Sequence, residues 1–425
     1  MKFTTALRAE ARRKIEAMES ADIVVGIPAY NNSPTIEHVV TAVSKGLKRY
    51  FNGMRSVIVV SDGGSVDDTR EQARNAEIEP WVERVVSIYR GVSGKGTAIR
   101  QIFEVAGTLG ARACAMVDSD LRSITPEWIR NLLRPVTEGG YDYVTPYYNR
   151  YKYDGTITNN IVYFLTRSLY GKRVRQPIGG DFAFSPKMIK YCKDQDVWQT
   201  DVGRFGIDIW LTTTAIVQKF KICQVRLGAK VHDVKDPVSH LGPMFRQVVD
   251  TMMVLMDENA FYWMKVEGST KVPILGKVHS QEPAPFDVDH ATLVHRFKIG
   301  YQQFSSVWKG FLAEDNYKQL QTMARLSPGK FVFPDELWCK VLFDYAVAFH
   351  SWEANRHVLT TLMTPLYYAR IASFINTTKE MSNREAEQQI EKAAETFEDL
   401  KPYLVERWRT MSEELAWREP GRINT

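Results

Sequence analysis

The sequence predicts an α/β fold over about its first 230 residues, followed by a helical appendage. Short apolar runs alternate with stretches of helical periodicity in the first part, which is typical of a parallel sheet with helices on both faces. Polar residues and glycines directly follow the apolar runs, at the sheet edge where ligands bind in such folds. After about residue 245 the strand-like runs end, and long stretches rich in Trp, Phe, Tyr and Met at helical spacing follow.

At the start of the chain, the charged segment 1–21 is predicted to form an N-terminal helix. After the first strand, Ser33 as N-cap and Pro34 in the first turn begin a helix. After the second strand, Ser65 and Asp68 have the spacing of a capping box. The predicted strands are 23–28, 57–62, 85–89 and 113–117, and a further apolar run occupies 222–231. Predicted helices occupy 33–47, 97–106 and 206–219.

The length of 425 residues exceeds one average domain of about 100–200 residues. We expect an α/β domain over residues 22–250 and a mostly helical region over 251–425. The aromatic-rich stretch 335–375 favours helix–helix packing over a cofactor site, because aromatic stripes usually bury area. The same helices are candidates for contact between subunits of a homo-oligomer.

Composition excludes several classes of protein. A hydrophobic content of 44% is enough for a core, which excludes a disordered chain. The net charge of +5 is lower than a dedicated nucleic-acid binder carries, so we expect no nucleic-acid partner. No apolar run reaches the roughly 18 residues of a membrane span, and the N-terminus lacks the apolar core of a signal peptide. The four cysteines form no CxxC pair, so we expect a reduced, cytoplasmic protein.

The central chemical signal is Asp118-Ser119-Asp120, directly after a predicted buried strand. Two carboxylates two residues apart at the end of a strand can jointly hold a divalent cation, and hard oxygen ligands suit Mg²⁺ or Mn²⁺. The alternative is a solvated acidic loop.

Further signals follow other strands. In Gly94-Lys95-Gly96, glycines allow the backbone to approach a phosphate and Lys95 supplies charge, although an ordinary strand–helix turn has the same composition. The segment 176–181 (QPIGGD) places Asp181 after two glycines, as a ligand site or a structural turn would. Asp208 stands early in a helix, where it faces a cleft or interacts favourably with the helix dipole. His232 is a packed or surface residue, or a metal ligand beside the aspartates.

Together these motifs are more specific than any one of them. In order along the chain they are IPAYNN (27–32), SDGGSVDDT (61–69), GKG (94–96), DSD (118–120), QPIGGD (176–181), GRFGID (203–208), AKVH (229–232) and HLGPMFRQV (240–248). The chain resembles the retaining GT-A glycosyltransferases that make hexosylglycerates, namely the mannosylglycerate, glucosylglycerate and glucosyl-3-phosphoglycerate synthases. The resemblance covers about residues 22–250 and implies a Rossmann-like nucleotide-diphospho-sugar transferase domain.

The resemblance also implies roles for individual residues. The nucleotide sugar would be bound by Pro28, Ala29, Tyr30, Asn32, Asp62, Gly63, Lys95, Asp118 and Ser119. The donor sugar and the acceptor would face Thr158, Gly179, Gly180, Asp181 and Asp208. The metal, Mg²⁺ or Mn²⁺, would be held by Asp118, Asp120 and His232, and the catalytic residues would be Lys95, Asp120 and Asp208.

The implied reaction moves a hexose from a nucleoside-diphosphate sugar to D-glycerate, with glucose favoured and mannose the alternative. Thr156 stands where the phosphoglycerate synthases tend to carry a basic residue, which favours free glycerate, although Lys152 or Arg150 could substitute. Asn32 replaces a frequent nucleotide-binding Glu, and this leaves the base of the donor open. The alternative hypotheses for the function are a glucosyl-3-phosphoglycerate synthase, a GT-A enzyme with a lipid or polysaccharide acceptor, and a sugar-binding protein with a vestigial site.

Overall fold

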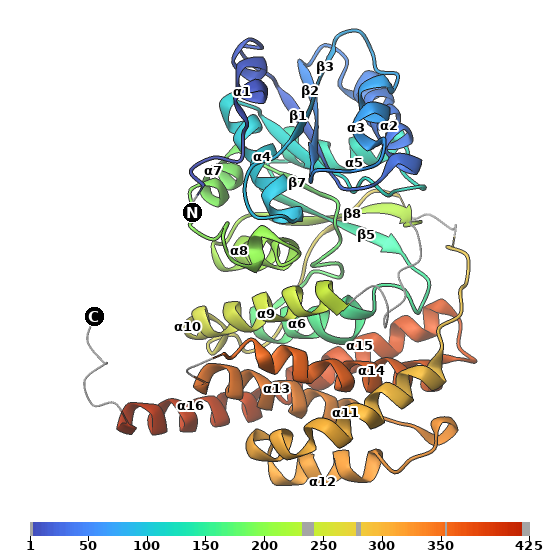
Figure 1. Cartoon of the computed structure of the whole chain (residues 1–425), viewed down its shortest axis with the longest axis vertical. Helices are drawn as coiled ribbons and strands as arrows, with labels where there is room; N and C mark the ends of the chain where they lie inside the picture. The colour runs from blue at the N-terminus through green and yellow to red at the C-terminus, as the bar shows by residue number, and fades with distance from the viewer. Residues whose placement is uncertain (1–2, 232–241, 278–281, 353–354, 419–425) are drawn as a thin grey trace. The chain divides into compact units, whose positions relative to one another are not determined.

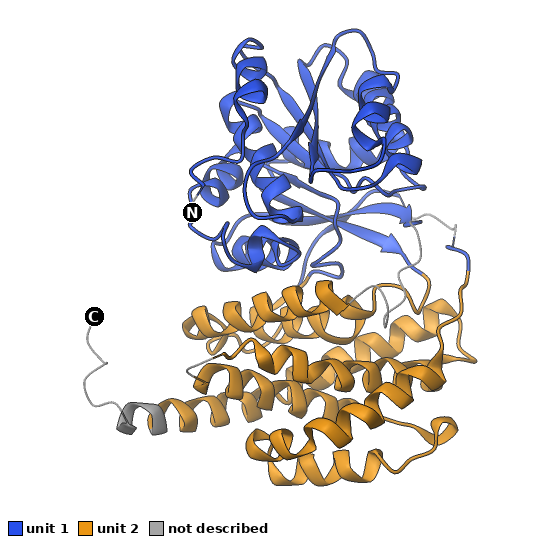
Figure 2. Cartoon of the chain, in the orientation of Figure 1, with its two compact units in different colours: residues 1–150, 174–234, 271–284 blue, residues 151–173, 235–270, 285–425 orange. Residues whose placement is uncertain are grey.

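The computed structural model describes residues 3–231, 242–277, 282–352 and 355–418 (Figure 1). The chain divides into two compact units (Figure 2). The first unit contains residues 1–150, 174–234 and 271–284, and the second contains 151–173, 235–270 and 285–425. The division is therefore not a single cut at residue 250, because 151–173 leaves the first unit and 271–284 returns to it. That the two parts act as separate domains stays a prediction.

The first unit is built on an eight-stranded sheet in the order β10-β8-β5-β7-β4-β1-β2-β3. All neighbouring strands are parallel except β7, which runs antiparallel between β4 and β5. The strands are β1 (Ile23–Ala29), β2 (Ser56–Asp62), β3 (Val82–Ile88), β4 (Ala113–Met116), β5 (Tyr143–Asn149), β7 (Phe182–Phe184), β8 (Ile222–Ala229) and β10 (Ile274–Leu275). The four predicted strands are present with shifted ends, and the apolar run 222–231 contains β8, while β5, β7 and β10 add to them.

Helices cover both faces of this sheet, as predicted. Figure 1 shows α2, α3 and α5 on one face, and α1, α4 and α7 on the other. The helices are α1 (Ala9–Glu16), α2 (Ser33–Phe51), α3 (Thr69–Asn75), α4 (Lys95–Thr108), α5 (Pro126–Thr137), α7 (Pro186–Lys193) and α8 (Ile207–Val217). Buried aliphatic side chains of β1, β2, α2 and α5 form a continuous core on the first face. The predicted N-terminal helix is shorter than residues 1–21.

Two predicted helix caps are wrong. Asn32, not Ser33, is the N-cap of α2, and its side chain makes no capping bond. The predicted capping box of α3 is absent because Ser65 Oγ instead donates to Asp62 Oδ2 at 2.5 Å, and Asp68 makes no side-chain cap. Ser33 is instead the first residue of α2, and Ser65 stands in the loop that follows β2.

The second unit is helical, which confirms the predicted appendage. Its helices are α6 (Tyr163–Tyr170), α9 (Gly242–Glu258), α10 (Ala260–Trp263), α11 (His290–Phe311), α12 (Glu314–Met323), α13 (Asp335–Ser351), α14 (Val358–Thr378), α15 (Asn383–Asp399) and α16 (Lys401–Arg418). A two-stranded sheet pairs β6 (Lys172–Arg173) with β9 (Thr270–Lys271). The aromatic side chains predicted to pack between helices do so, and Trp338 and Tyr345 are fully buried.

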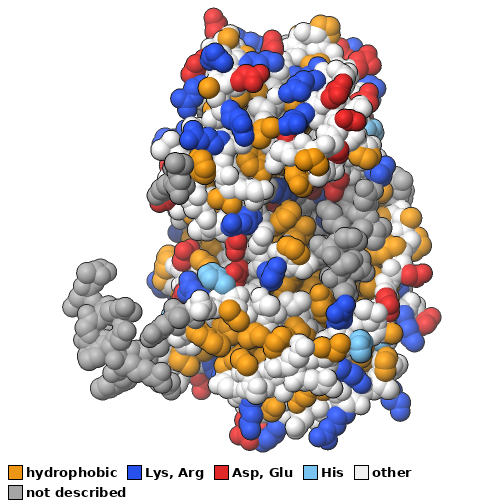
Figure 3. Space-filling view, viewed as in Figure 1, with side chains coloured by type: hydrophobic (Ala, Val, Ile, Leu, Met, Phe, Trp, Pro, Cys, Tyr) orange, Lys and Arg blue, Asp and Glu red, His pale blue; other side chains and the backbone are white. Residues whose placement is uncertain are grey.

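The surface, the hydropathy of the helices and the cysteines can be described from the structure. Figure 3 shows basic and acidic side chains interspersed on the visible face. Among the described residues, no helix is long and apolar enough to cross a membrane. All four cysteines are buried and unpaired.

Candidate active site

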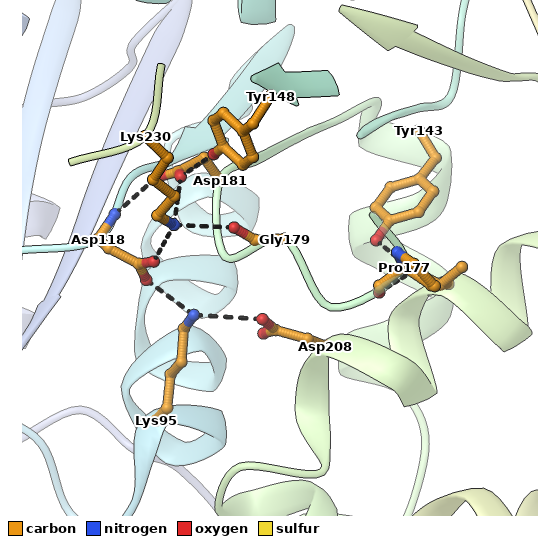
Figure 4. A network of polar contacts seen from close by, with 10 residues as sticks. Lys95, Asp118, Tyr143, Tyr148, Pro177, Gly179, Asp181, Asp208 and Lys230 are labelled. Carbon is orange, nitrogen blue, oxygen red and sulfur yellow. Dashed lines mark hydrogen bonds and ion pairs between the residues drawn. The ribbon is translucent and has the colours of Figure 1, made fainter. Parts of the chain in front are cut away.

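A cluster of charged side chains lies at the carboxyl edge of the sheet (Figure 4). Asp118 comes two residues after the end of β4, and Lys230 directly follows β8. Lys95 is the first residue of α4, and Asp208 is the second residue of α8. Because parallel strands end at the same edge, residues far apart in the sequence meet here.

Asp118 is the centre of this cluster. Its Oδ1 accepts from Lys95 Nζ at 2.8 Å and its Oδ2 accepts from Lys230 Nζ at 2.8 Å. Its backbone N–H donates to Asp181 Oδ1 at 2.8 Å. Burial alone would raise the pKa of Asp118, but the two lysines outweigh it and hold the pKa well below the usual range. Asp118 is therefore a fixed anion at neutral pH.

Asp208 differs from Asp118 in how completely it is paired. Its Oδ2 lies 3.3 Å from Lys95 Nζ, while its Oδ1 is buried and has no hydrogen-bond partner. Burial raises the pKa of Asp208, and Lys95 opposes this rise. The same two carboxylates, Asp118 and Asp208, raise the pKa of Lys95 although burial opposes its charge. A buried acceptor without a donor is costly, so Asp208 Oδ1 is suited to a hydroxyl of a ligand.

Lys230 is a member of the cluster that the sequence analysis did not single out. Its Nζ donates to Asp118, to Asp181 Oδ2 at 2.9 Å and to the Gly179 carbonyl at 2.9 Å. Tyr148 of β5 donates its hydroxyl to Asp181. The available sequence signal was its place at the end of a strand, two residues before the candidate ligand His232.

The residues predicted to bind a nucleotide line the neighbouring strand ends. The Asp62 carboxylate accepts from the backbone N–H groups of Gly64 and Ser65 at 2.8 and 2.9 Å, which shapes the turn after β2. Tyr30, after β1, is 60% exposed and presents an aromatic ring at this edge. Asn32 Oδ1 accepts from Ser119 Oγ at 2.7 Å, so the loops after β1 and β4 are tied together. Of the other predicted residues, Pro28 and Ala29 end β1, and Gly63 donates to the Ala29 carbonyl at 2.8 Å.

The glycines of the two predicted loops are required by packing. A Cβ on Gly180 would lie 2.1 Å from Asp118 Oδ2, and one on Gly179 would lie 2.3 Å from Pro146 Cγ. A Cβ on Gly96 would lie 1.8 Å from the Val202 carbonyl. The close approach expected of these glycines is thus made to the protein itself, and Lys95 is the group of its loop that faces the charged cluster.

The three remaining predicted residues are Asp120, Thr158 and His232. Asp120 is half-buried, two residues beyond Asp118. Thr158 is buried in a π-helical turn (Thr158–Val162) of the second unit. His232 lies outside the described residues, and among the described ones no group of three or more His, Cys, Asp or Glu side chains is arranged to hold a metal ion.

The carboxylates nevertheless suit a divalent cation. Asp118 and Asp120 offer hard oxygen donors, the ligand type preferred by Mg²⁺ and Mn²⁺. Each oxygen of Asp118 accepts one lysine bond, and a carboxylate has about four lone-pair sites, so Asp118 retains acceptor capacity. The donor set of the site therefore fits the predicted ion.

The mixed sheet and the cluster at its carboxyl edge define a GT-A fold, the fold of nucleotide-diphospho-sugar transferases. Residues 24–194 match the sequence model of glycosyl transferase family 2.

Several relatives are similar over the same region. The chain is 27% identical to the glucosyl-3-phosphoglycerate synthase of Mycolicibacterium smegmatis over 261 residues, 56% of this chain and 79% of that protein. It is 26% identical over 260 residues to the same synthase of Mycobacterium tuberculosis, 54% of this chain and 72% of that protein.

Two solved structures of synthases align with part of this chain. The M. tuberculosis glucosyl-3-phosphoglycerate synthase with Mn²⁺, UDP and glucosyl-3-phosphoglycerate aligns with a TM-score of 0.43 and 23% identity, over 60% of this chain and 86% of that one. The mannosyl-3-phosphoglycerate synthase of Rubrobacter xylanophilus aligns with a TM-score of 0.41 and 17% identity, over 59% and 78%.

Proposed function

We propose that this chain transfers a hexose from a nucleoside-diphosphate sugar to D-glycerate, with glucose favoured over mannose. The product is then glucosylglycerate or mannosylglycerate, a compatible solute. The observation that carries the proposal is the position of Lys95 between Asp118 and Asp208 at the carboxyl edge of the sheet, in a chain that matches the family 2 model. The sequence similarity to glucosyl-3-phosphoglycerate synthases supports an acceptor of the glycerate type.

In the proposed reaction, the residues of the cluster have separate tasks. Lys95, a permanent cation, stabilises charge on the leaving diphosphate, where such stabilisation contributes most. Asp208 uses its unpartnered Oδ1 to orient a hydroxyl of the sugar or the acceptor. For retention, the leaving phosphate accepts the proton of the acceptor hydroxyl, so no side-chain base is required.

The proposed metal ligands are Asp118, Asp120 and His232. A bound Mg²⁺ or Mn²⁺ supplies Lewis-acid stabilisation of diphosphate oxygens. Tyr30, Asn32, Asp62 and Ser119, with the neighbouring backbone, are proposed to bind the nucleoside, because they line the strand ends beside Asp118.

The second unit bears on the choice between free and phosphorylated glycerate. Lys152 Nζ donates to the carbonyls of Thr378, Lys379 and Met381 at 2.7 to 3.0 Å, where it caps the end of α14. The Thr156 hydroxyl is engaged by Tyr367 at 2.6 Å. Because Lys152 is committed to these carbonyls, it is a poor replacement for a phosphate-binding cation. This removes one of the two candidate cations, Lys152 and Arg150, and so favours free glycerate, with 3-phosphoglycerate as the alternative acceptor.

The test is a transfer assay on purified protein. UDP-, GDP- and ADP-linked glucose and mannose are each combined with glycerate or 3-phosphoglycerate, with and without Mg²⁺ or Mn²⁺. We expect metal-dependent transfer to glycerate, and loss of transfer in Asp120→Ala with an unchanged melting temperature. Asp194→Ala removes an exposed carboxylate as the matched control. Full activity of Asp120→Ala, or no transfer with any pair, would refute the proposal.

Two further expectations belong to the proposal. A cytoplasmic location accords with four unpaired cysteines, since disulfides are rare in reducing compartments. Assembly into a homo-oligomer through the C-terminal helices is tested by light scattering of the full chain after size-exclusion chromatography. A monomeric mass would exclude it.

A further inference from the structure

Lys230 joins three segments that are distant in the sequence. Its Nζ contacts Asp118 after β4, and both the Gly179 carbonyl and Asp181 in the turn before β7. Its side chain is only 4% exposed, and the ring of Tyr148 lies 5.1 Å from its Nζ. All three donor positions of the ammonium group are therefore used by protein acceptors.

The arrangement fixes the orientation of Asp118. Lys230 holds Oδ2, and Asp181 accepts the backbone N–H of the same residue at 2.8 Å. Oδ1 is consequently directed to Lys95. The chain after Lys230 is tied to the chain after β4 as well, since Val231 N–H donates to Ser123 Oγ at 2.9 Å and the Val231 carbonyl accepts from Arg122 N–H at 2.9 Å.

We propose that Lys230 is a positioning residue for donor binding, which holds the Asp118 carboxylate and the 179–181 turn in the geometry that receives the nucleotide diphosphate. This inference rests on the proposed function of the site. Lys230 itself has no free donor for a ligand, so it acts through Asp118. A role in stability alone is the competing explanation, because Asp181 is fully buried and needs a counter-charge.

The experiment separates these explanations with a charge-balanced pair of variants. Asp181→Asn keeps the contact between Lys230 and Asp118. The double variant Lys230→Met with Asp181→Asn removes this contact, and it also avoids leaving the Asp181 carboxylate buried without a counter-charge. Lys230→Arg is the conservative variant, and Lys190→Met, with a side chain 79% exposed, is the surface control. Each protein is measured for melting temperature, for binding of UDP, GDP and ADP with and without Mn²⁺ by calorimetry, and for the KM of donor and acceptor.

We expect the double variant to bind the nucleotide about 10- to 100-fold more weakly than Asp181→Asn, the range for one charged hydrogen bond. The donor KM should rise by a similar factor, the acceptor KM should stay within about twofold, and Lys230→Arg should recover part of the loss. Equal nucleotide affinity in Asp181→Asn and the folded double variant would overturn the inference. If the wild-type chain binds none of the three nucleotides, the proposed function itself fails, which is a distinguishable result.

Discussion

A methyl group at position 180 probes whether Asp118 is held as tightly as the structure indicates. Gly180 has a φ of +89°, and an added Cβ would lie 2.1 Å from Asp118 Oδ2. Real Cβ contacts essentially never fall under 3.0 Å, so the carboxylate must move by about 0.9 Å. That movement acts on the same oxygen that accepts Lys230 at 2.8 Å. Gly180→Ala should therefore disturb both the fold and the site.

The magnitude has two parts. An L-residue in the left-handed region costs about 1–2 kcal/mol. Losing a charged hydrogen bond between Lys230 and Asp118 costs about 1.5–3 kcal/mol more. Gly53 offers a matched control, because its φ is +90° and a Cβ there would meet nothing within 4 Å. Gly53→Ala should therefore lose only the unfolding free energy that the backbone conformation costs. The additional loss in Gly180→Ala then measures the cost of the clash with Asp118.

The assay is urea unfolding followed by circular dichroism, with transfer kinetics on the same preparations. We expect Gly180→Ala to lose about 1.5–3 kcal/mol more unfolding free energy than Gly53→Ala. If the displacement of Asp118 is carried into the transition state, kcat/KM falls by about 10- to 100-fold. Equal stabilities of the two variants, with wild-type kinetics for Gly180→Ala, would refute the geometry described for Asp118.

Three predictions concern groups away from the site. Burial lowers the pKa of Lys401 from 10.5 to about 8, so the unfolded chain holds this proton more tightly and the unfolding free energy rises between pH 8 and 10.5. Lys401→Met should remove about 2–3 kcal/mol of that rise, measured as the difference between urea unfolding at pH 7.5 and 10; parallel pH dependence in both proteins would contradict it. Glu104 accepts the Thr5 hydroxyl at 2.5 Å and the Ala6 N–H, so Glu104→Gln should speed hydrogen exchange in residues 3–8, and unchanged exchange would argue against this anchor. Arg167 is 1% exposed and pairs with Glu391 and Glu398. Arg167→Met should lower the unfolding free energy in urea by about 3 kcal/mol, and an unchanged value would show that the pairs contribute little.

The sequence predicted the regular part of the fold well, and its failures have physical causes. Strand β5 was missed because Pro146 interrupts it, and proline is rare inside a sheet. The structure tolerates Pro146 since β7 pairs only with Tyr143 and Val144 of that strand, so the missing N–H falls beyond the end of β7. Strand β7 has only three residues, too few for a periodic signal. Its antiparallel direction depends on tertiary pairing that no local pattern records.

The site was predicted unevenly for a similar reason. Asp118, Lys95 and Asp208 were found because each stands in a short motif after a strand or at a helix start, and the structure brings these three together. Lys230 stands in the AKVH segment, but that motif was interpreted only for His232, and the importance of Lys230 depends on three acceptors from other parts of the chain. The glycines were recognised as sites of close approach, but the partners at Gly96 and Gly180 are protein atoms. Local composition can signal that space is scarce without revealing what fills it.

The charge balance of the cluster connects its structure to the proposed chemistry. Three carboxylates, Asp118, Asp181 and Asp208, are in ion-pair contact with two ammonium groups, Lys95 and Lys230. Burial raises the pKa of Asp181 and Asp208, as expected where negative charge is incompletely compensated. Asp118 takes most of the available positive charge, which leaves Asp208 with an unpartnered oxygen. A ligand that brings a divalent cation and a hydroxyl would satisfy both deficits at once, so the electrostatics of the cluster favour the metal-dependent sugar transfer that we propose.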